Sequence, residues 1–188
     1  MKAFLILEDG NVFTGTSIGS TREVISEIVF NTSMTGYLEV LTDPSYAGQA
    51  VVMTYPLIGN YGITPDMESK KPWPDGYIVR ELSRMPSNFR CEGTIQDFLT
   101  KNDIPGIAGI DTRALTKILR EKGTMNGMIT TDLTHVDMDK IQRDVGEDND
   151  KPEEKVLDIP ENIMDQIRLV STYKGIHVPS MLFDSTGT

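Results

Sequence analysis

The side chains that could act as nucleophiles are few and widely separated in the sequence. Cys91 is the only cysteine, and it follows Arg90, a cation that favours the reactive thiolate form. Neither His135 nor His177 is close to it in the sequence, and the residues around Cys91 lack the small side chains of a strand-to-helix nucleophile elbow. Cysteines without an activating partner are more often structural than catalytic. We therefore expect no catalytic residue in this chain.

Sequence signatures for metal, cofactor and nucleotide binding are also missing. Two isolated histidines provide no metal-ligand spacing, and no carboxylate falls within a His-x-x-x-His or Cys-x-x-Cys frame. The chain contains neither Gly-x-x-x-x-Gly-Lys-Ser/Thr nor a Gly-x-Gly-x-x-Gly motif after a predicted strand. The sequence thus predicts no metal site, no cofactor and no self-contained active site.

A polar segment between two predicted strands, residues 31–49, is the best candidate for recognition. It combines hydroxyl, amide and carboxylate groups with two tyrosines and only four aliphatic residues. Residues 42–45 predict a turn, because Pro44 fixes φ and the side chain of Asp43 or Ser45 can bond to nearby backbone. Polar loops often carry recognition sites. The same side chains can instead serve only their own loop backbone, and composition leaves both interpretations open.

The elements that must position this segment are mainly predicted strands. Residues 3–7 and 11–14 predict a hairpin that turns at Asp9-Gly10. β-branched and aromatic residues predict further strands, and a small apolar run lies among them. These strands are predicted at 24–30, 50–55, 76–82 and 125–131, and the apolar run covers 106–110.

Two helices are predicted in the second half of the chain. Residues 94–99 begin with Thr94 as a possible cap and space their apolar residues three and four positions apart. The stronger prediction covers 111–123, where Asp111 can cap the first turn and Gly123 can end the helix. An apolar stripe lies between these two ends. Strands and helices together indicate a mixed α/β fold.

The charge of the chain excludes several classes of function. Among 188 residues, 18 are Lys or Arg and 28 are Asp or Glu, which gives a formal net charge of −10. Such an acidic chain, without a basic cluster, disfavours nucleic acid and membrane surfaces as partners. Residues 132–168 carry seven of the ten net charges, and 146–155 contain no apolar residue, so we expect a solvated linker there rather than an acidic docking tail. Without an export signal or a disulfide framework, we expect a cytoplasmic location.

Several motifs, spread in order over residues 1–131, resemble one known family. They are Leu7-Glu8-Asp9-Gly10, Asn31-Thr32-Ser33-Met34-Thr35-Gly36-Tyr37, Leu41-Thr42-Asp43-Pro44-Ser45-Tyr46, Thr54-Tyr55-Pro56 with Ile58-Gly59-Asn60-Tyr61-Gly62, Ser87-Asn88-Phe89-Arg90, Ile110-Asp111-Thr112-Arg113-Ala114-Leu115-Thr116, and Leu119-Arg120-Glu121-Lys122-Gly123 with Asn126-Gly127. Together they resemble the N-terminal domain of the small, glutamine-hydrolysing subunit of carbamoyl-phosphate synthase.

The resemblance implies a particular fold and division of the chain. In that family the N-terminal domain is an α/β domain of the β/β/α swivelling type. We expect its core at 1–131, an acidic helical or linker segment of the same domain at 132–170, and a tail at 171–188 that we cannot match to the family by motif. The tail is consistent with a shortened product carrying foreign residues, a split gene product or a diverged end.

The resemblance also implies a function shared with other polypeptides. Family members join this domain to a glutamine amidotransferase domain that holds a Cys-His-Glu triad; we expect that half to be absent here, and Cys91 is not its nucleophile. A large synthetase subunit, which uses ATP and Mg²⁺, combines the released ammonia with bicarbonate to form carbamoyl phosphate for arginine and pyrimidine synthesis. On the resemblance, Ser45 contributes to binding L-glutamine across the domain interface, and its hydroxyl can both donate and accept.

Two other functions remain open at this stage. A stand-alone binding or regulatory module could retain the fold without the synthase partnership, and the unmatched tail and acidic segment are the features that support it. A phosphohistidine carrier is suggested only by the swivelling fold type. Neither His135 nor His177 has the helix N-terminal setting that favours a phosphoryl group. Dependence on glutamine or on free ammonia also stays open, because the deciding nucleophile is not in this sequence.

Overall fold

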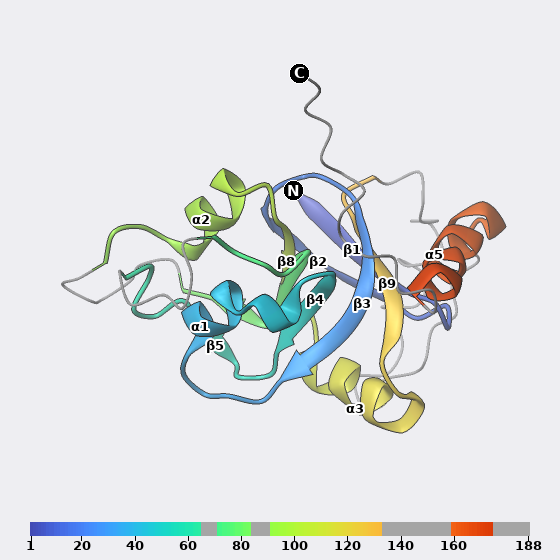
Figure 1. Cartoon of the computed structure of the whole chain (residues 1–188), viewed down its shortest axis with the longest axis horizontal. Coiled ribbons are helices and arrows are strands. Elements are labelled where there is room, and N and C mark those ends of the chain that lie inside the picture. The colour runs from blue at the N-terminus through green and yellow to red at the C-terminus, as the bar shows by residue number, and fades with distance from the viewer. Residues whose placement is uncertain (65–70, 84–90, 133–158, 175–188) are drawn as a thin grey trace, which may run out of the picture.

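A closed barrel of seven strands forms the centre of the structure (Figure 1). This computed structural model describes residues 1–64, 71–83, 91–132 and 159–174. The barrel strands are β1 (Lys2–Leu7), β2 (Val12–Gly19), β3 (Val24–Asn31), β4 (Gln49–Met53), β6 (Gly76–Val79), β8 (Pro105–Ala108) and β9 (Met125–Thr130). Around the barrel they follow the order β1-β2-β8-β6-β4-β3-β9.

Helices and a small second sheet surround this barrel. The helices are α1 (Tyr37–Thr42), α2 (Ile95–Lys101), α3 (Thr112–Lys122) and α5 (Glu161–Lys174), with a 3₁₀ turn, η1 (Pro44–Tyr46). The second sheet pairs β5 (Leu57–Ile58) with β7 (Glu81–Leu82). The prediction of a mixed α/β fold is confirmed, and the sheet dominates its core.

The direction of the strands gives the barrel two different ends. The neighbours β3, β4, β6 and β8 are parallel to one another, whereas β2 and β9 run the opposite way. The carboxyl ends of four consecutive strands therefore meet at one end of the barrel. At that end α3 follows β8, and its buried Leu115 and Leu119 join the cluster of side chains that fills the barrel interior.

Most of the predicted elements are present. The hairpin turns at Asp9-Gly10, where the Leu7 backbone N–H donates to the Asn11 carbonyl at 2.8 Å. Thr94 caps α2 by accepting from the Asp97 backbone N–H at 3.1 Å. The predicted helix 111–123 is α3. The Asp111 carboxylate accepts from the first backbone N–H groups of that helix, and Gly123 ends it with a φ of 90°.

The strand predicted at 76–82 is wrong in one respect. It divides at Arg80 into β6, which lies in the barrel, and β7, which pairs with β5 outside it. The Arg80 carbonyl accepts from the Gly109 backbone N–H at 2.9 Å. This single bond takes the place of a continued ladder, so the chain leaves the barrel after Val79.

Apolar residues on both sides of the barrel wall form separate clusters. One cluster fills the interior, and a second packs α1 and α2 against the outer face of the parallel strands. On another side, Ile163, Met164 and Ile167 of α5 cover Phe4, Ile6 and Met128 of the barrel. Burying three such side chains contributes about 1.5–3 kcal/mol each. The helix α5 therefore packs on the barrel, and it continues past residue 170 to Lys174.

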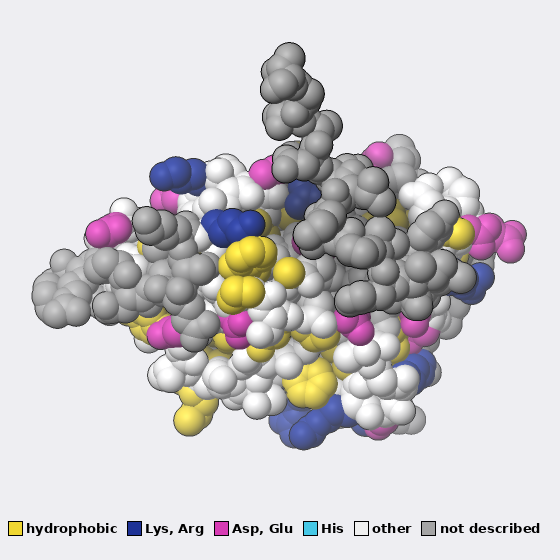
Figure 2. All heavy atoms as spheres, in the orientation of Figure 1, with side chains coloured by type: hydrophobic (Ala, Val, Ile, Leu, Met, Phe, Trp, Pro, Cys, Tyr) yellow, Lys and Arg dark blue, Asp and Glu magenta, His cyan; other side chains and the backbone are white. Residues whose placement is uncertain are grey.

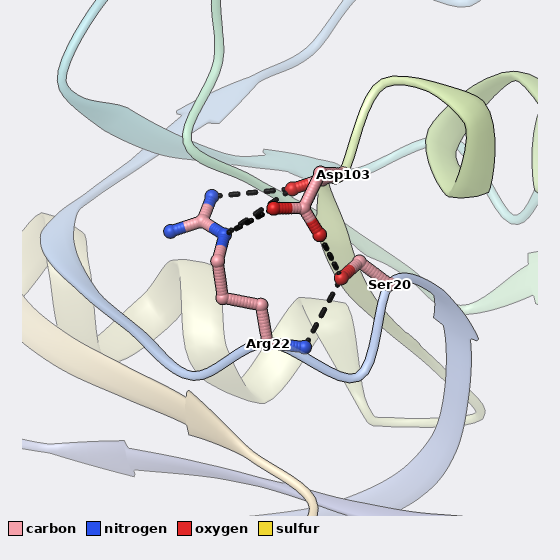
Figure 3. Close-up of polar contacts among 3 residues, drawn as sticks. All are labelled: Ser20, Arg22 and Asp103. Atoms are coloured by element: carbon pink, nitrogen blue, oxygen red, sulfur yellow. Dashed lines mark hydrogen bonds and ion pairs between the residues drawn. The ribbon is translucent and has the colours of Figure 1, made fainter.

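A polar cluster of Ser20, Arg22 and Asp103 stabilises the loops at the amino end of the parallel strands (Figure 3). Ser20 donates its hydroxyl proton to Asp103, and the same hydroxyl accepts from the Arg22 backbone N–H at 3.1 Å. The Arg22 guanidinium donates to the Asp103 carbonyl at 3.2 and 3.3 Å. Asp103 itself has a left-handed φ of 54°. These contacts join the β2–β3 loop to the turn between α2 and β8, and they give this cluster a structural role.

Several predicted features lie outside the described residues. These are His135, His177, the Ser87-Asn88-Phe89-Arg90 motif, the predicted linker at 146–155 and the end of the chain from residue 175.

Close packing of β8 between its neighbours yields a stability prediction. A Cβ atom at Gly106 would lie 2.8 Å from the Tyr77 carbonyl oxygen and 2.9 Å from Cγ1 of Ile18. The Tyr77 carbonyl belongs to β6 and cannot move away without breaking the hydrogen bonds between β6 and β8. Gly106→Ala should therefore lower the free energy of unfolding by about 1–3 kcal/mol or more. Urea denaturation followed by circular dichroism measures this change.

Gly93→Ala is the matched control for that substitution. No heavy atom outside its neighbours lies within 4 Å of the added Cβ, so its unfolding midpoint should stay close to that of the wild type. Equal midpoints for the two variants would contradict the close packing of β8.

Candidate functional site

Ser45 lies in the short turn η1, between α1 and β4. The Asp43 carboxylate accepts from the Ser45 backbone N–H at 2.8 Å, and Pro44 occupies the first position of the turn. The predicted turn at 42–45 is therefore formed by the expected side chain. The Ser45 side chain is exposed, and its hydroxyl makes no hydrogen bond with any other described residue. The turn thus presents to solvent a hydroxyl that can donate and accept.

Part of the segment predicted as a polar loop is instead the helix α1. Tyr37, Leu38, Leu41 and Thr42 are buried, and Thr42 donates its hydroxyl proton to the Leu38 carbonyl at 2.8 Å. These side chains serve the fold and are not available for recognition. Local sequence signals for this helix are weak, because it is six residues long and Gly36 provides no side-chain cap. Apart from Glu39 of α1, the exposed residues of the segment lie before and after this helix.

Two tyrosines fasten the start of α1 to the loop that follows β5. The rings of Tyr37 and Tyr61 stack with centroids 4.1 Å apart. The Tyr37 hydroxyl donates to the Gly62 carbonyl at 2.9 Å, and the Tyr61 hydroxyl accepts from the Gly36 backbone N–H at 3.2 Å. The sequence motifs 31–37 and 58–62 therefore meet in space, which their separation in the sequence does not reveal.

The far side of the same segment is fastened to β3. The Asn31 amide donates to the Tyr46 hydroxyl at 2.9 Å. Ser26 hydrogen bonds through its hydroxyl to the Gly48 carbonyl at 2.9 Å and to the Asp75 carboxylate at 3.0 Å. Since the residues on either side of Ser45 are held by β3 or by their own turn, the backbone that carries its hydroxyl is fixed before any ligand binds.

Cys91 shows the features of a structural thiol. It is half-buried, and its Sγ lies 3.2 Å from the Gly93 carbonyl oxygen, to which it donates. Within the described part of the chain, no group of three or more His, Cys, Asp or Glu side chains is arranged to hold a metal ion. Among the same residues, no helix is long and apolar enough to cross a membrane.

A second candidate site is a pocket of about 720 Å³ at the carboxyl ends of the parallel strands. Thr32 follows β3, Thr54 follows β4, Arg80 follows β6, and Asp111 lies between β8 and α3; all four line the pocket. The first turns of α3 complete its wall. Carboxyl ends of parallel strands are a common place for binding sites. Sequence reasoning missed this pocket because its walls come from four distant segments, which the strand order alone brings together.

The fold and the two sites define a class of protein: a mixed α/β barrel domain that holds polar and charged groups at its surface. Comparison with known proteins identifies the family. Residues 5–129 match the family model described as "Carbamoyl-phosphate synthase small chain, CPSase domain". The chain belongs to this family.

Curated relatives agree with that assignment. The chain is 57% identical over 145 residues to the carbamoyl phosphate synthase small chain of Clostridium perfringens, which covers 76% of this chain and 42% of the relative. It is 50% identical over 179 residues to the small chain of Oceanobacillus iheyensis, covering 95% and 45%. It is also similar to the pyrimidine-specific small chain of Halalkalibacterium halodurans, at 47% identity over 180 residues, covering 95% and 46%.

Coverage in these alignments has two consequences. The chain spans less than half the length of these relatives. The match to O. iheyensis leaves only nine of the 188 residues unaligned, so it includes part of the segment 171–188 that the sequence motifs did not place.

The buried tyrosines predict a distinctive titration. Burial raises the pKa of Tyr37, Tyr61 and Tyr77 above the ordinary value of a phenol. Repulsion from the Tyr61 phenolate raises the pKa of Tyr37 further, and repulsion from both Tyr37 and Tyr61 does the same for Tyr77. In ultraviolet difference spectroscopy, at least three of the six tyrosines should resist ionisation above a pH of about 10 while the chain is folded.

The sign of the stability change follows from the raised pKa values. The unfolded chain ionises these phenols first, so the free energy of unfolding should be constant below a pH of about 10 and fall above it. In denaturant all six tyrosines should ionise in one transition. A single transition in the folded chain as well would contradict the buried cluster.

Proposed function

We propose that this chain is the docking and coupling domain of a glutamine-dependent carbamoyl-phosphate synthase small subunit. The observation that supports this most directly is the family match over residues 5–129, which covers five of the seven barrel strands in full and includes parts of β1 and β9. In this proposal a glutamine amidotransferase domain releases ammonia from L-glutamine. A large subunit, with ATP and Mg²⁺, joins the ammonia to bicarbonate, and this domain holds the two activities together in the cytoplasm.

The pathway served by the product is part of the same proposal. Carbamoyl phosphate would feed pyrimidine and arginine synthesis, and one relative is named as pyrimidine-specific. The described residues offer a pocket and a polar turn, which suits a domain whose chemistry is completed by partners.

Ser45 is the residue that we assign to glutamine binding. Its exposed hydroxyl, which has no hydrogen-bond partner among the described residues, and the fixed turn that carries it fit a contact made across a domain interface. An amino acid offers both a carboxylate and an ammonium group, and a serine hydroxyl can bind either one.

Docking is tested by mixing the chain with a purified large subunit of O. iheyensis carbamoyl phosphate synthase and separating the mixture by size-exclusion chromatography. The expected result is co-elution, with or without an amidotransferase domain. Separate elution under both conditions would contradict docking and favour the alternative, a stand-alone binding or regulatory module.

The role of Ser45 is tested in a fusion in which this chain replaces the matching part of the O. iheyensis small chain. Ser45→Ala should raise KM for glutamine about fivefold, because one hydrogen bond is worth about 1 kcal/mol. Ammonia-dependent synthesis does not use this contact, so the ratio of glutamine- to ammonia-dependent rate should fall.

Ser33→Ala is the control for this test. Ser33 is exposed in the same segment, and it makes its hydrogen bond to Asn31 through the backbone N–H, which the substitution retains. Its KM for glutamine should equal that of the parent fusion. Equal KM values for all three proteins would remove Ser45 from the glutamine site.

The chain alone should lack glutaminase activity. Ammonia release from glutamine, measured in a coupled assay, should not exceed the rate in buffer, because no described side chain forms a nucleophile and base pair with Cys91. Turnover that survives Cys91→Ala would show a catalytic centre that this proposal does not contain.

A further inference from the structure

Four positive side chains line the pocket at the carboxyl ends of the parallel strands. Arg80 follows β6, whereas Arg113, Lys117 and Arg120 come from α3 at intervals of four and three residues, which place them on one face of the helix. All four residues are exposed. They gather in a chain whose net charge is −10, so this surface is opposite in sign to the protein as a whole.

Most of these cations lack an ionic partner among the residues that the structure describes. Arg80, Arg113 and Arg120 form no side-chain hydrogen bond or ion pair with any residue that the structure describes. Lys117 lies 3.9 Å from Glu121, and with side chains 76% and 62% exposed this pair contributes little. The pocket's own carboxylate, Asp111, already accepts from the Arg113 and Ala114 backbone N–H groups. The positive charge at this surface is therefore left for a group outside the described residues.

Apolar side chains border the same pocket. Pro56 lines it, and its neighbours Tyr55 and Leu57 are each 39% exposed. Figure 2 shows Lys and Arg side chains gathered at the lower edge of the molecule, near α3, with hydrophobic side chains beside them. Arginine and aromatic residues are enriched at the centres of protein interfaces. The combination therefore suits a protein partner better than a small ion.

We propose that this carboxyl-end face, formed by Arg80, Arg113, Lys117 and Arg120 with Tyr55 and Leu57, docks on a surface of the large subunit that presents carboxylates among apolar side chains. The inference rests on the proposed function and adds to it the face that makes the contact. Arginine binds carboxylates in a bidentate geometry. Apolar contact around such an ion pair excludes water and strengthens the electrostatic attraction. A nucleic acid is a poor alternative, because the net charge of −10 repels a polyanion.

The test measures the dissociation constant of the complete chain for the large subunit of O. iheyensis carbamoyl phosphate synthase by isothermal titration calorimetry. The double variant Arg113→Glu with Arg120→Glu should raise Kd about tenfold or more, because it places like charges against the partner. The wild-type Kd should rise with salt, and the Kd of the double variant should rise less. Tyr55→Ala tests the apolar border and should weaken binding severalfold.

Lys101→Glu is the matched control. It reverses an exposed cation in the last turn of α2, away from the residues that line the pocket. Its Kd should equal that of the wild type. Circular dichroism and unfolding midpoints of all variants should match the wild type, since every substituted side chain is exposed.

Each result decides between specific conclusions. If the wild-type chain does not bind, the proposed function and this face both fail. If it binds and the double variant binds equally well, docking stands and this face is wrong. A third arm titrates inorganic phosphate into the chain alone. Saturable phosphate binding that the double variant abolishes, with docking unchanged, would make the pocket a small-anion site and overturn the inference.

Discussion

The close contact of β2 with β8 is the constraint on which the rest of the structure depends. It joins the N-terminal hairpin to a strand from the second half of the chain, with Thr16 opposite Ala108, and it closes the barrel. The contact leaves no room for a side chain at position 15, since a Cβ at Gly15 would lie 2.4 Å from the Ala108 carbonyl oxygen. Once the barrel closes, its two ends are defined. The cluster around Asp103 then lies at one end and the pocket at the other.

The connection from β3 to β4 carries both candidate sites. It begins at the pocket with Thr32, passes through α1 to Ser45, and enters β4, which returns the chain to the pocket at Thr54. Hydrogen bonds from Asn31, Ser26 and the two stacked tyrosines fix this route against the barrel. Because this segment holds Ser45 and also borders the pocket, a glutamine contact at Ser45 and a docking contact at the pocket would keep a constant spacing, which is what coupling between two partners requires.

Local signals in the sequence predicted the elements whose ends carry their own caps. Asp111 and Gly123 located α3, and Asp9-Gly10 located the hairpin. The helix α1 was missed because it is held by tertiary contacts of Tyr37 and not by a cap. The pocket could not be predicted, because Thr32, Thr54, Arg80 and the helix α3 become neighbours only through strand order. Ser45 was assigned by resemblance, and the residues alone predicted only its turn.

The packing of α5 bears on where the domain can be cut. The family match ends at residue 129, yet Phe4, Ile6 and Met128 on the outer wall of the barrel are covered by Ile163, Met164 and Ile167. A protein shortened to the family boundary would expose these apolar side chains along the adjacent strands β1 and β9, and exposed apolar patches promote aggregation. The helix α5 therefore covers apolar surface of the barrel, and a soluble recombinant fragment should retain it.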